Sequence, residues 1–504
     1  KSDKMRAVIG CLSLHRFGYR DFTDLSTTFD RTIPQTEPEY VAFTSYAAGE
    51  LTLHPSQEQS RYVQHLLERS LGWIRGSGRR ARPLAAAQMI KSLAVNAGNN
   101  IVSFLPQFQT SVWLLLKQRS IAVLEATASL IKNLTISVIR YARADLEDYL
   151  SFYTQICLRL LSYGSYIRMY AALIIIEQFV TLQPGFYLKL IISLYTTIID
   201  VTAHAPPHLR SAAYVTISCF AEINPKLFID TIAPDLFEIT PDLLRLYPSD
   251  IVRALIMLMK SIPEWMKEKI PELIQFVIDL LETNAFPHSL SVPSSLPHSP
   301  PNPNMKELSP RIFEDSALNL LGQIVTIFGK DAFPLNNDLL TKMAALKMSE
   351  AYIFCFTSLS KIEGAVPIDL FKKSVINKIQ IELKGKNADL ALKFISDLPP
   401  TLFEGNSGSP KVLDWIQSTY VSGDVKTRCE TTAAIFQVLK ICKPEDYKKI
   451  LLESLNIAVF DESQKVRCSV LRVIKDHCNK ELGEPENIKF LEIYANDEDQ
   501  EVRK

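Results

Sequence analysis

The chain has 504 residues, 47% of them hydrophobic, and its 55 basic and 55 acidic residues balance to a formal net charge of +0. This apolar content suffices for several domains or one long solenoid. The neutral balance excludes a nucleic-acid binder that works through bulk positive potential, although not a local basic patch. Only 17 glycines occur, and because tight-turned β architectures usually need more, the composition favours helices.

Apolar residues recur at helical spacing along the whole chain, and the alternation typical of strands is nearly absent. We expect Pro184 to end one helix, and Pro234 and Pro241 to interrupt another. The helices expected before residue 285 span 5–14, 40–51, 56–75, 84–95, 104–116, 121–134, 150–161, 167–180, 187–201, 209–222, 227–246, 251–262 and 272–282.

Residues 285–310 break this pattern with seven prolines and many serines, so we expect a partly disordered loop between repeats. The sequence therefore predicts a first solenoid segment at 1–284, the loop at 285–310 and a second solenoid segment at 311–504. Ser299 and Ser309 each precede a proline and are candidate regulatory sites. A tolerated insertion is the interpretation that we favour for the loop.

The helical pattern resumes after the loop, with one further loop at 399–410. The helices expected in this part span 314–328, 339–346, 351–362, 370–383, 388–396, 412–420, 428–441, 447–459, 466–478 and 487–495. The first residue is Lys, and the sequence stops where another helix begins. We therefore expect the chain to be part of a longer polypeptide.

A short motif recurs near the end of the chain. Asp461-Glu-Ser-Gln-Lys-Val-Arg467 returns as Asp497-Glu-Asp-Gln-Glu-Val-Arg503, an acidic turn followed by an apolar residue and an arginine that open a helix. Similar arginines stand at Arg168, Arg210, Arg253 and Arg428. The intervals are 42 residues (168 to 210), 43 (210 to 253), 39 (428 to 467) and 36 (467 to 503). A period near 40 with two helices per period predicts an all-α solenoid of HEAT or armadillo type.

The recurring arginines have two interpretations. A guanidinium at a fixed position of each second helix can bond the carbonyls of the preceding turn and the acidic residue of an adjacent repeat, which suits its planar fork. A row of exposed arginines can instead bind an acidic partner. We favour the structural interpretation, because repeats share packing more than they share ligands.

No catalytic constellation stands out. The sequence has no GxxxxGK[ST], GxGxxG or HExxH motif. His204 and His208 are separated by two prolines, so they cannot share a helix face to hold a metal. The basic cluster at Arg79, Arg80 and Arg82 has no interleaved aromatic residues, so we interpret it as a solvated turn and not as a nucleic-acid site. We therefore predict no catalytic, cofactor-binding or metal site in these residues.

The eight cysteines include no CxxC pair, which indicates a reducing compartment without a disulfide framework. No signal peptide is visible. The long apolar stretches, such as Leu188 to Val201, are interrupted before 18 residues, so we expect no membrane span.

The sequence resembles the N-terminal HEAT-repeat region of target-of-rapamycin (TOR) Ser/Thr protein kinases, which belong to the PI3K-related kinases. The turn Arg79-Arg80 with the Ala-rich helix to Val95 is similar to a TOR repeat. So are the units at 104–113 and 121–134 and the tandem run from Phe460 to Arg503. These matches follow one another in the same order over almost the whole chain.

The resemblance implies a non-catalytic scaffold arm of a kinase that controls cell growth in response to nutrients. It implies a kinase domain outside these residues, where ATP and Mg would bind. It also implies dimerisation with a second copy, docking of a Raptor- or Rictor-type subunit and contact with a small GTPase. The implied location is the cytoplasm, with attachment to endomembranes through partners.

A stand-alone HEAT adaptor is the alternative. It would be a transport receptor or a phosphatase scaffold. The neutral net charge disfavours a transport receptor, because such receptors are usually acidic. Kinase motifs in the parent transcript beyond Lys504 would decide between the two.

Overall fold

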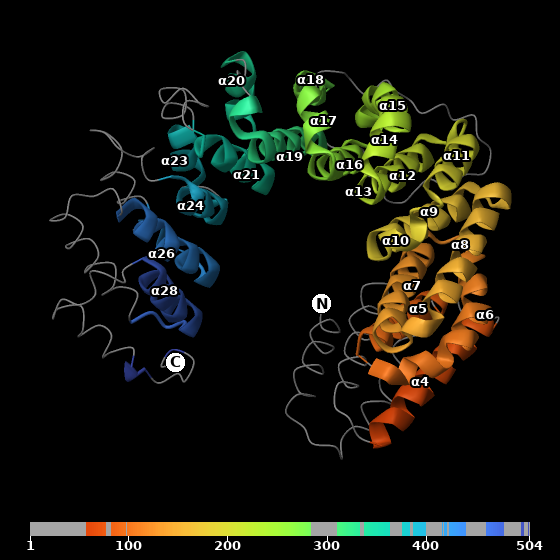
Figure 1. Cartoon of the computed structure of the whole chain (residues 1–504). Helices are drawn as coiled ribbons and strands as arrows, with labels where there is room; N and C mark the ends of the chain where they lie inside the picture. The colour runs from red at the N-terminus through yellow and green to blue at the C-terminus, as the bar shows by residue number, and fades with distance from the viewer. Residues whose placement is uncertain are drawn as a thin grey trace. The chain divides into compact units, whose positions relative to one another are not determined.

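The computed structural model describes residues 57–76, 82–96, 98–283, 310–332, 337–362, 375–383, 387–399, 416, 418–420, 423–439, 460–477, 495–497 and 502. These residues form helices and turns without a β-strand among them (Figure 1), which confirms the all-α prediction. The chain divides into two compact units, Lys1–Ile262 and Pro263–Lys504. This division falls before the proline-rich segment at 285–310, of which residues 285–309 lie outside the described residues.

In the first unit, one helix of each repeat packs on the matching helix of the next repeat, and together these helices form a row. The other helices of the unit cover this row. The row consists of α5 (Arg82–Asn96), α7 (Ile121–Tyr141), α9 (Tyr166–Leu182), α12 (Pro207–Ser218) and α16 (Pro248–Ser261), each packed on the next. Around it stand α4 (Gln57–Arg75), η4 (Gly98–Phe104), α6 (Leu105–Leu116), η5 (Arg143–Asp145), α8 (Leu146–Tyr163), α10 (Pro184–Tyr187), α11 (Ile191–Thr202), α13 (Phe220–Ile223), α14 (Pro225–Thr231) and α15 (Ala233–Leu246).

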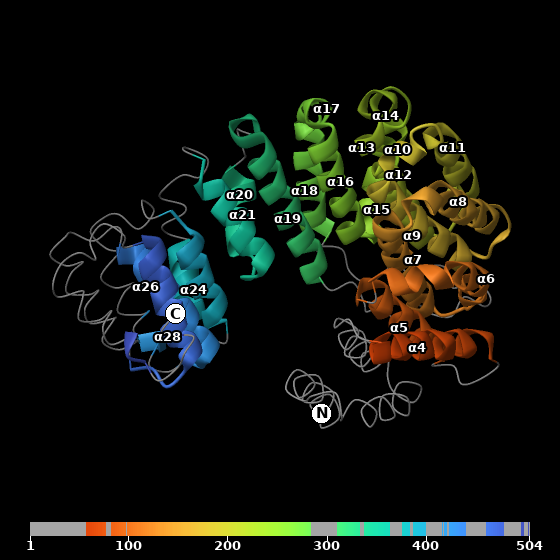
Figure 2. The ribbon, with the colours of Figure 1, turned by 60° about the horizontal axis from the view of Figure 1, so that its bottom comes forward.

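The second unit has the same organisation. Its row consists of α19 (Pro310–Phe328), α21 (Glu350–Ser360), α24 (Ala388–Asp397), α26 (Val425–Leu439) and α28 (Gln464–His477), again packed in sequence. Figures 1 and 2 show α24, α26 and α28 side by side. The other described elements are α17 (Pro263–Glu268), α18 (Ile270–Thr283), η6 (Gly329–Ala332), α20 (Asn337–Ala345) and α23 (Asn377–Leu383).

The repeat period is visible in where the row helices begin. In the first unit they begin at residues 82, 121, 166, 207 and 248, at intervals of 39, 45, 41 and 41. In the second they begin at 310, 350, 388, 425 and 464, at intervals of 40, 38, 37 and 39. A constant period with two helices in each repeat is the organisation of a HEAT-type solenoid.

Apolar side chains of the row helices form the core. In α9, Leu173, Ile176 and Phe179 are fully buried, as the nearly all-apolar segment predicted. Aromatic rings join neighbouring helices: Tyr153 of α8 stands edge-on to Phe179, with centroids 6.0 Å apart. Such edge-to-face contacts stabilise packing by about 0.5–1.5 kcal/mol beyond the area they bury.

One row helix has the length and composition of a membrane span. An 18-residue window of α7 has a mean hydropathy of 1.4, and 61% of that window is buried inside the structure. No membrane span was expected from the sequence, because the long apolar stretches are interrupted before 18 residues, and that criterion does not single out this helix. Since α7 packs between α5 and α9, its apolar character is accounted for by burial among the row helices.

One expectation about prolines is confirmed and one was wrong. Helix α9 ends at Leu182, just before Pro184, as expected. Pro184 then occupies the first turn of α10, where its missing N–H has no intrahelical partner to lose. Pro241 lies inside α15, whereas the sequence analysis expected an interruption there. Leu236, Leu243 and Leu244 are buried on either side of it, so packing holds the helix together through the proline.

Candidate functional site: an arginine–aspartate ladder

The acidic turn before α28 is formed by its own polar groups. The Asp461 carboxylate accepts a hydrogen bond from the Ser463 N–H at 2.8 Å. The Ser463 carbonyl in turn accepts from the N–H groups of Val466 (3.0 Å) and Arg467 (3.2 Å), which closes the first helical turn. Val466 is fully buried. This local geometry places the Arg467 side chain at a fixed point, because both the turn before it and the residue next to it are anchored.

Arg467 joins two successive acidic turns. Its Nε and Nη2 donate to the two carboxylate oxygens of Asp497 at 2.7 and 2.9 Å, and its Nη1 donates to the carbonyl of Asp461 at 2.8 Å. The side chains of Arg467 and Asp497 are only 8% and 9% exposed. A bidentate pair with so little solvent contact is charge-assisted and geometrically specific.

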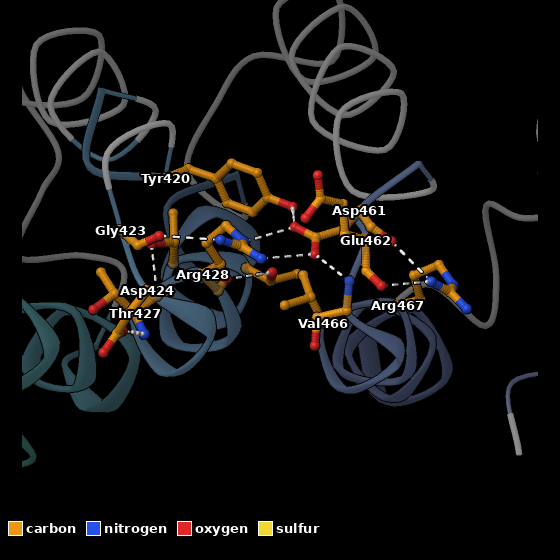
Figure 3. Close-up of polar contacts among 12 residues, drawn as sticks. Tyr420, Gly423, Asp424, Thr427, Arg428, Asp461, Glu462, Val466 and Arg467 are labelled. Carbon is orange, nitrogen blue, oxygen red and sulfur yellow. Dashed lines mark hydrogen bonds and ion pairs between the residues drawn. The ribbon is translucent and has the colours of Figure 1, made fainter.

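Arg428, in the first turn of α26, repeats the arrangement one period earlier (Figure 3). Its Nε and Nη2 donate to Asp461 at 2.8 and 3.1 Å, and its Nη1 donates to the Gly423 carbonyl at 3.1 Å. The Tyr420 hydroxyl donates to the same Asp461 carboxylate at 2.7 Å. We call this series, Arg428–Asp461 followed by Arg467–Asp497, the ladder.

Electrostatics keep the Arg428–Asp461 pair of the ladder ionised. Burial raises the pKa of Asp461, but the hydrogen bonds from Arg428, Tyr420 and the Ser463 N–H outweigh burial and lower the pKa below its ordinary value. The pKa of Arg428 is raised, chiefly by its hydrogen bonds with Asp461. Both groups are therefore charged at neutral pH. Neither is poised to exchange a proton, so this pair offers a fixed link between repeats and no acid–base chemistry.

The other recurring arginines do not continue the ladder. Arg168 donates to the Lys117 carbonyl at 3.5 Å, a contact with the turn of the preceding repeat. Arg253 forms an exposed ion pair with Glu177 at 3.3 Å. The Nε of Arg210 is buried and has no hydrogen-bond partner among the described residues. The sequence pattern thus groups arginines that occupy similar helix positions but contact different partners.

Several predicted residues lie outside the described part of the chain. These are Arg503, the serines of the loop and the first part of the basic cluster, namely Ser299, Ser309, Arg79 and Arg80. Their proposed roles stay predictions.

Sequence reasoning missed a second kind of link between repeats. The Ser137 hydroxyl of α7 donates to the carbonyl of Ala94 in α5 at 2.8 Å. The Thr216 hydroxyl of α12 donates to the carbonyl of Leu173 in α9 at 3.2 Å. Each bond joins residues 43 apart. Small hydroxyl residues within otherwise buried helices were the only available signal.

The described residues contain no group of three or more side chains that could hold a metal ion. Burial raises the pKa of the Cys157 and Cys355 thiols well above the ordinary value and that of Cys219 to about 12. Such thiols stay protonated at neutral pH and behave as small hydrophobic groups.

Comparison with known proteins yields similarity of fold. No protein-family model and no curated protein matches the sequence. Importin beta, in a crystal structure obtained in an ammonium sulfate condition, is 11% identical with a TM-score of 0.54; the match covers 92% of this chain and 66% of that one. The karyopherin Kap121p, bound to the SUMO protease Ulp1p, is 11% identical with a TM-score of 0.54; the match covers 96% of this chain and 57% of that one.

Kap95p, whose binding induces the switch loops of RanGDP to adopt the GTP-bound conformation, is 14% identical with a TM-score of 0.48; the match covers 99% of this chain and 65% of that one. This last score is too low to support an argument. The chain thus spans less than two thirds of the length of Kap95p and Kap121p, and 66% of importin beta. Together with the helix period, the likeness to importin beta and Kap121p establishes an all-α HEAT-type solenoid.

Proposed function

We propose that the chain is a non-catalytic scaffold that binds proteins through surfaces built from successive repeats. The observation that carries this proposal is the row of helices in each unit, in which each row helix packs on the next at a period near 40 residues. A solenoid of this kind presents an extended surface, because each repeat adds one strip to it. The charged groups of the ladder bond one another, so partner proteins bind to other, exposed side chains.

For the identity of the scaffold, we propose first the amino-terminal arm of a TOR-type Ser/Thr kinase. This proposal rests on the sequence resemblance at residues 79–95 and in the tandem run from Phe460 to Arg503. In this setting the arm dimerises, docks a Raptor- or Rictor-type subunit and positions substrates around a distant catalytic domain. Its location is then the cytoplasm, with recruitment to endomembranes through partners.

A transport receptor is the second candidate, and the structural comparisons favour it. Importin beta and Kap121p, the similar structures with a TM-score of 0.54, are both proteins of that class. In this setting the chain binds cargo proteins and a Ran-type GTPase. The two candidates share the solenoid and differ in partner, so they are separated by binding experiments.

The sequence of the parent transcript beyond Lys504 is the simplest test. Protein-kinase catalytic motifs downstream support the TOR arm. A further run of repeats that ends in a stop codon without a kinase domain contradicts it and supports the receptor.

A direct binding assay gives an independent answer. The purified chain is immobilised and exposed separately to a purified Raptor-type subunit and to a Ran-type GTPase loaded with a GTP analogue, and association is followed by interferometry. Saturable binding of the Raptor-type subunit alone is expected for the TOR arm. Saturable binding of the GTPase alone contradicts it. Binding of neither protein, by a chain whose thermal melt is cooperative, contradicts both identities.

A further inference from the structure

An ion pair in the first unit joins two repeats that are not neighbours. Arg253 of α16 lies 3.3 Å from the Glu177 carboxylate of α9, although the two residues are 76 positions apart. Helix α12 stands between them in the row and packs on both α9 and α16. In a solenoid each repeat contacts its immediate neighbours, so this pair is a contact that bypasses one repeat.

Helix α12 has the side chains that allow such an approach. Ser211 and Thr216 of α12 are fully buried, and Thr216 donates to the Leu173 carbonyl of α9 at 3.2 Å. Small side chains at such contacts let the flanking helices come close, because interhelical distance follows the size of the side chains at the contact. Polar bonds hold the flanking helices in place: Ser211 donates to Asp250 of α16 at 3.2 Å.

The buried thiol of Cys219 lies near this ion pair. Burial raises its pKa to about 12, the Glu177 carboxylate adds to that rise, and the Arg253 guanidinium opposes it. The thiol also donates to the carbonyl of Val215 at 3.4 Å. Cys219 is therefore within electrostatic reach of both members of the pair, and its access to solvent reports on the helices around it.

We propose that the Glu177–Arg253 pair is a clasp that holds α9 and α16 together across α12, and that opening the clasp uncovers the C-terminal end of α12 and Cys219, the residue that follows it. The Glu177 side chain is 15% exposed and that of Arg253 is 55% exposed. The Arg253 end of the pair is open to solvent although the Glu177 end is mostly buried, so salt and water compete for the guanidinium and weaken the pair. The clasp therefore opens readily, and it gives the first unit a local, reversible loosening at one repeat.

Thiol labelling of the full chain tests the clasp. The chain is treated with N-ethylmaleimide, and the labelling of each cysteine is measured by mass spectrometry against time. In Glu177→Gln and in Arg253→Gln, the rate at Cys219 rises about 2- to 5-fold, the range expected when an exposed pair is lost. High salt raises the rate in the parent chain but not in either variant. Cys157, which is fully buried in α8, serves as the internal control and keeps its rate.

The two variants separate opening from electrostatics. Removing the Glu177 charge lowers the pKa of the Cys219 thiol, whereas removing the Arg253 charge raises it. A purely electrostatic effect therefore changes labelling in opposite directions, while the clasp predicts a rise in both. The charge-reversed double variant, Glu177→Arg with Arg253→Glu, restores slow labelling. Opposite changes, unchanged rates or an equal rise at Cys157 overturn the proposal.

Discussion

Arg467→Ala removes the most buried link of the ladder. The substitution leaves the Asp497 carboxylate, 9% exposed, without its cation. It also removes the donor at 2.8 Å from the Asp461 carbonyl. Breaking a fully buried pair costs about 3–5 kcal/mol. Because both side chains keep slight solvent contact, we expect a loss of about 2–4 kcal/mol in the free energy of unfolding. For a unit of this size that loss lowers the melting temperature by roughly 5–10 °C.

Differential scanning calorimetry of the full chain measures this loss, with Lys426→Ala as the matched control. Lys426 also pairs with an aspartate of a neighbouring repeat, Asp389, at 2.6 Å. That pair is 69% and 29% exposed, so its loss is expected to leave the melting temperature unchanged. If both variants melt like the parent while partner binding is lost in Arg467→Ala, the ladder is a binding surface and the structural reasoning is refuted.

Three further outcomes are expected. The lowered pKa of Asp461 means that its stabilising contribution is present above the ordinary Asp pKa of about 4 and is lost as pH falls below that value. Urea unfolding detects this loss, and Asp461→Asn abolishes that pH dependence. Arg428→Lys keeps the charge but not the bidentate geometry, so its melting temperature falls between those of the parent and Arg428→Ala. Gly322→Ala places a Cβ 2.6 Å from the Phe354 ring and destabilises the chain by about 1–3 kcal/mol in urea titrations; Gly72→Ala, with no atom within 4 Å of its new Cβ, stabilises it by about 0.5–1 kcal/mol, and a loss there contradicts the steric argument.

The fold was predictable because its signal is local and repeated. The spacing of apolar residues predicts each helix. The recurrence of the acidic turn followed by an apolar residue and an arginine, as at Val466 and Arg467, indicates a period near 40. Helix ends were less predictable. Pro184 ends one helix and begins the next, as its position in a first turn allows. Pro241 lies within a helix, because burial on both sides outweighs the loss of one backbone hydrogen bond.

The ladder was predictable only where its partners belong to the repeating motif. Arg467 bonds Asp497, 30 residues away, which occupies in the next repeat the motif position that Asp461 occupies in its own. Arg253 reaches Glu177, a residue without any motif and 76 positions distant. No sequence pattern encodes that contact, since it depends on how far α12 allows its neighbours to approach.

The contacts of the ladder all run from one repeat to the next in the same order. Each arginine bonds the aspartate of the acidic turn that follows it. Arg467 also bonds the backbone carbonyl of Asp461, and the Asp461 carboxylate accepts from Arg428. A disturbance at Asp497 therefore loosens Arg467 first, then the turn at Asp461, and only then the repeat before it. We therefore expect this part of the chain to unfold sequentially from its C-terminal end, one repeat at a time.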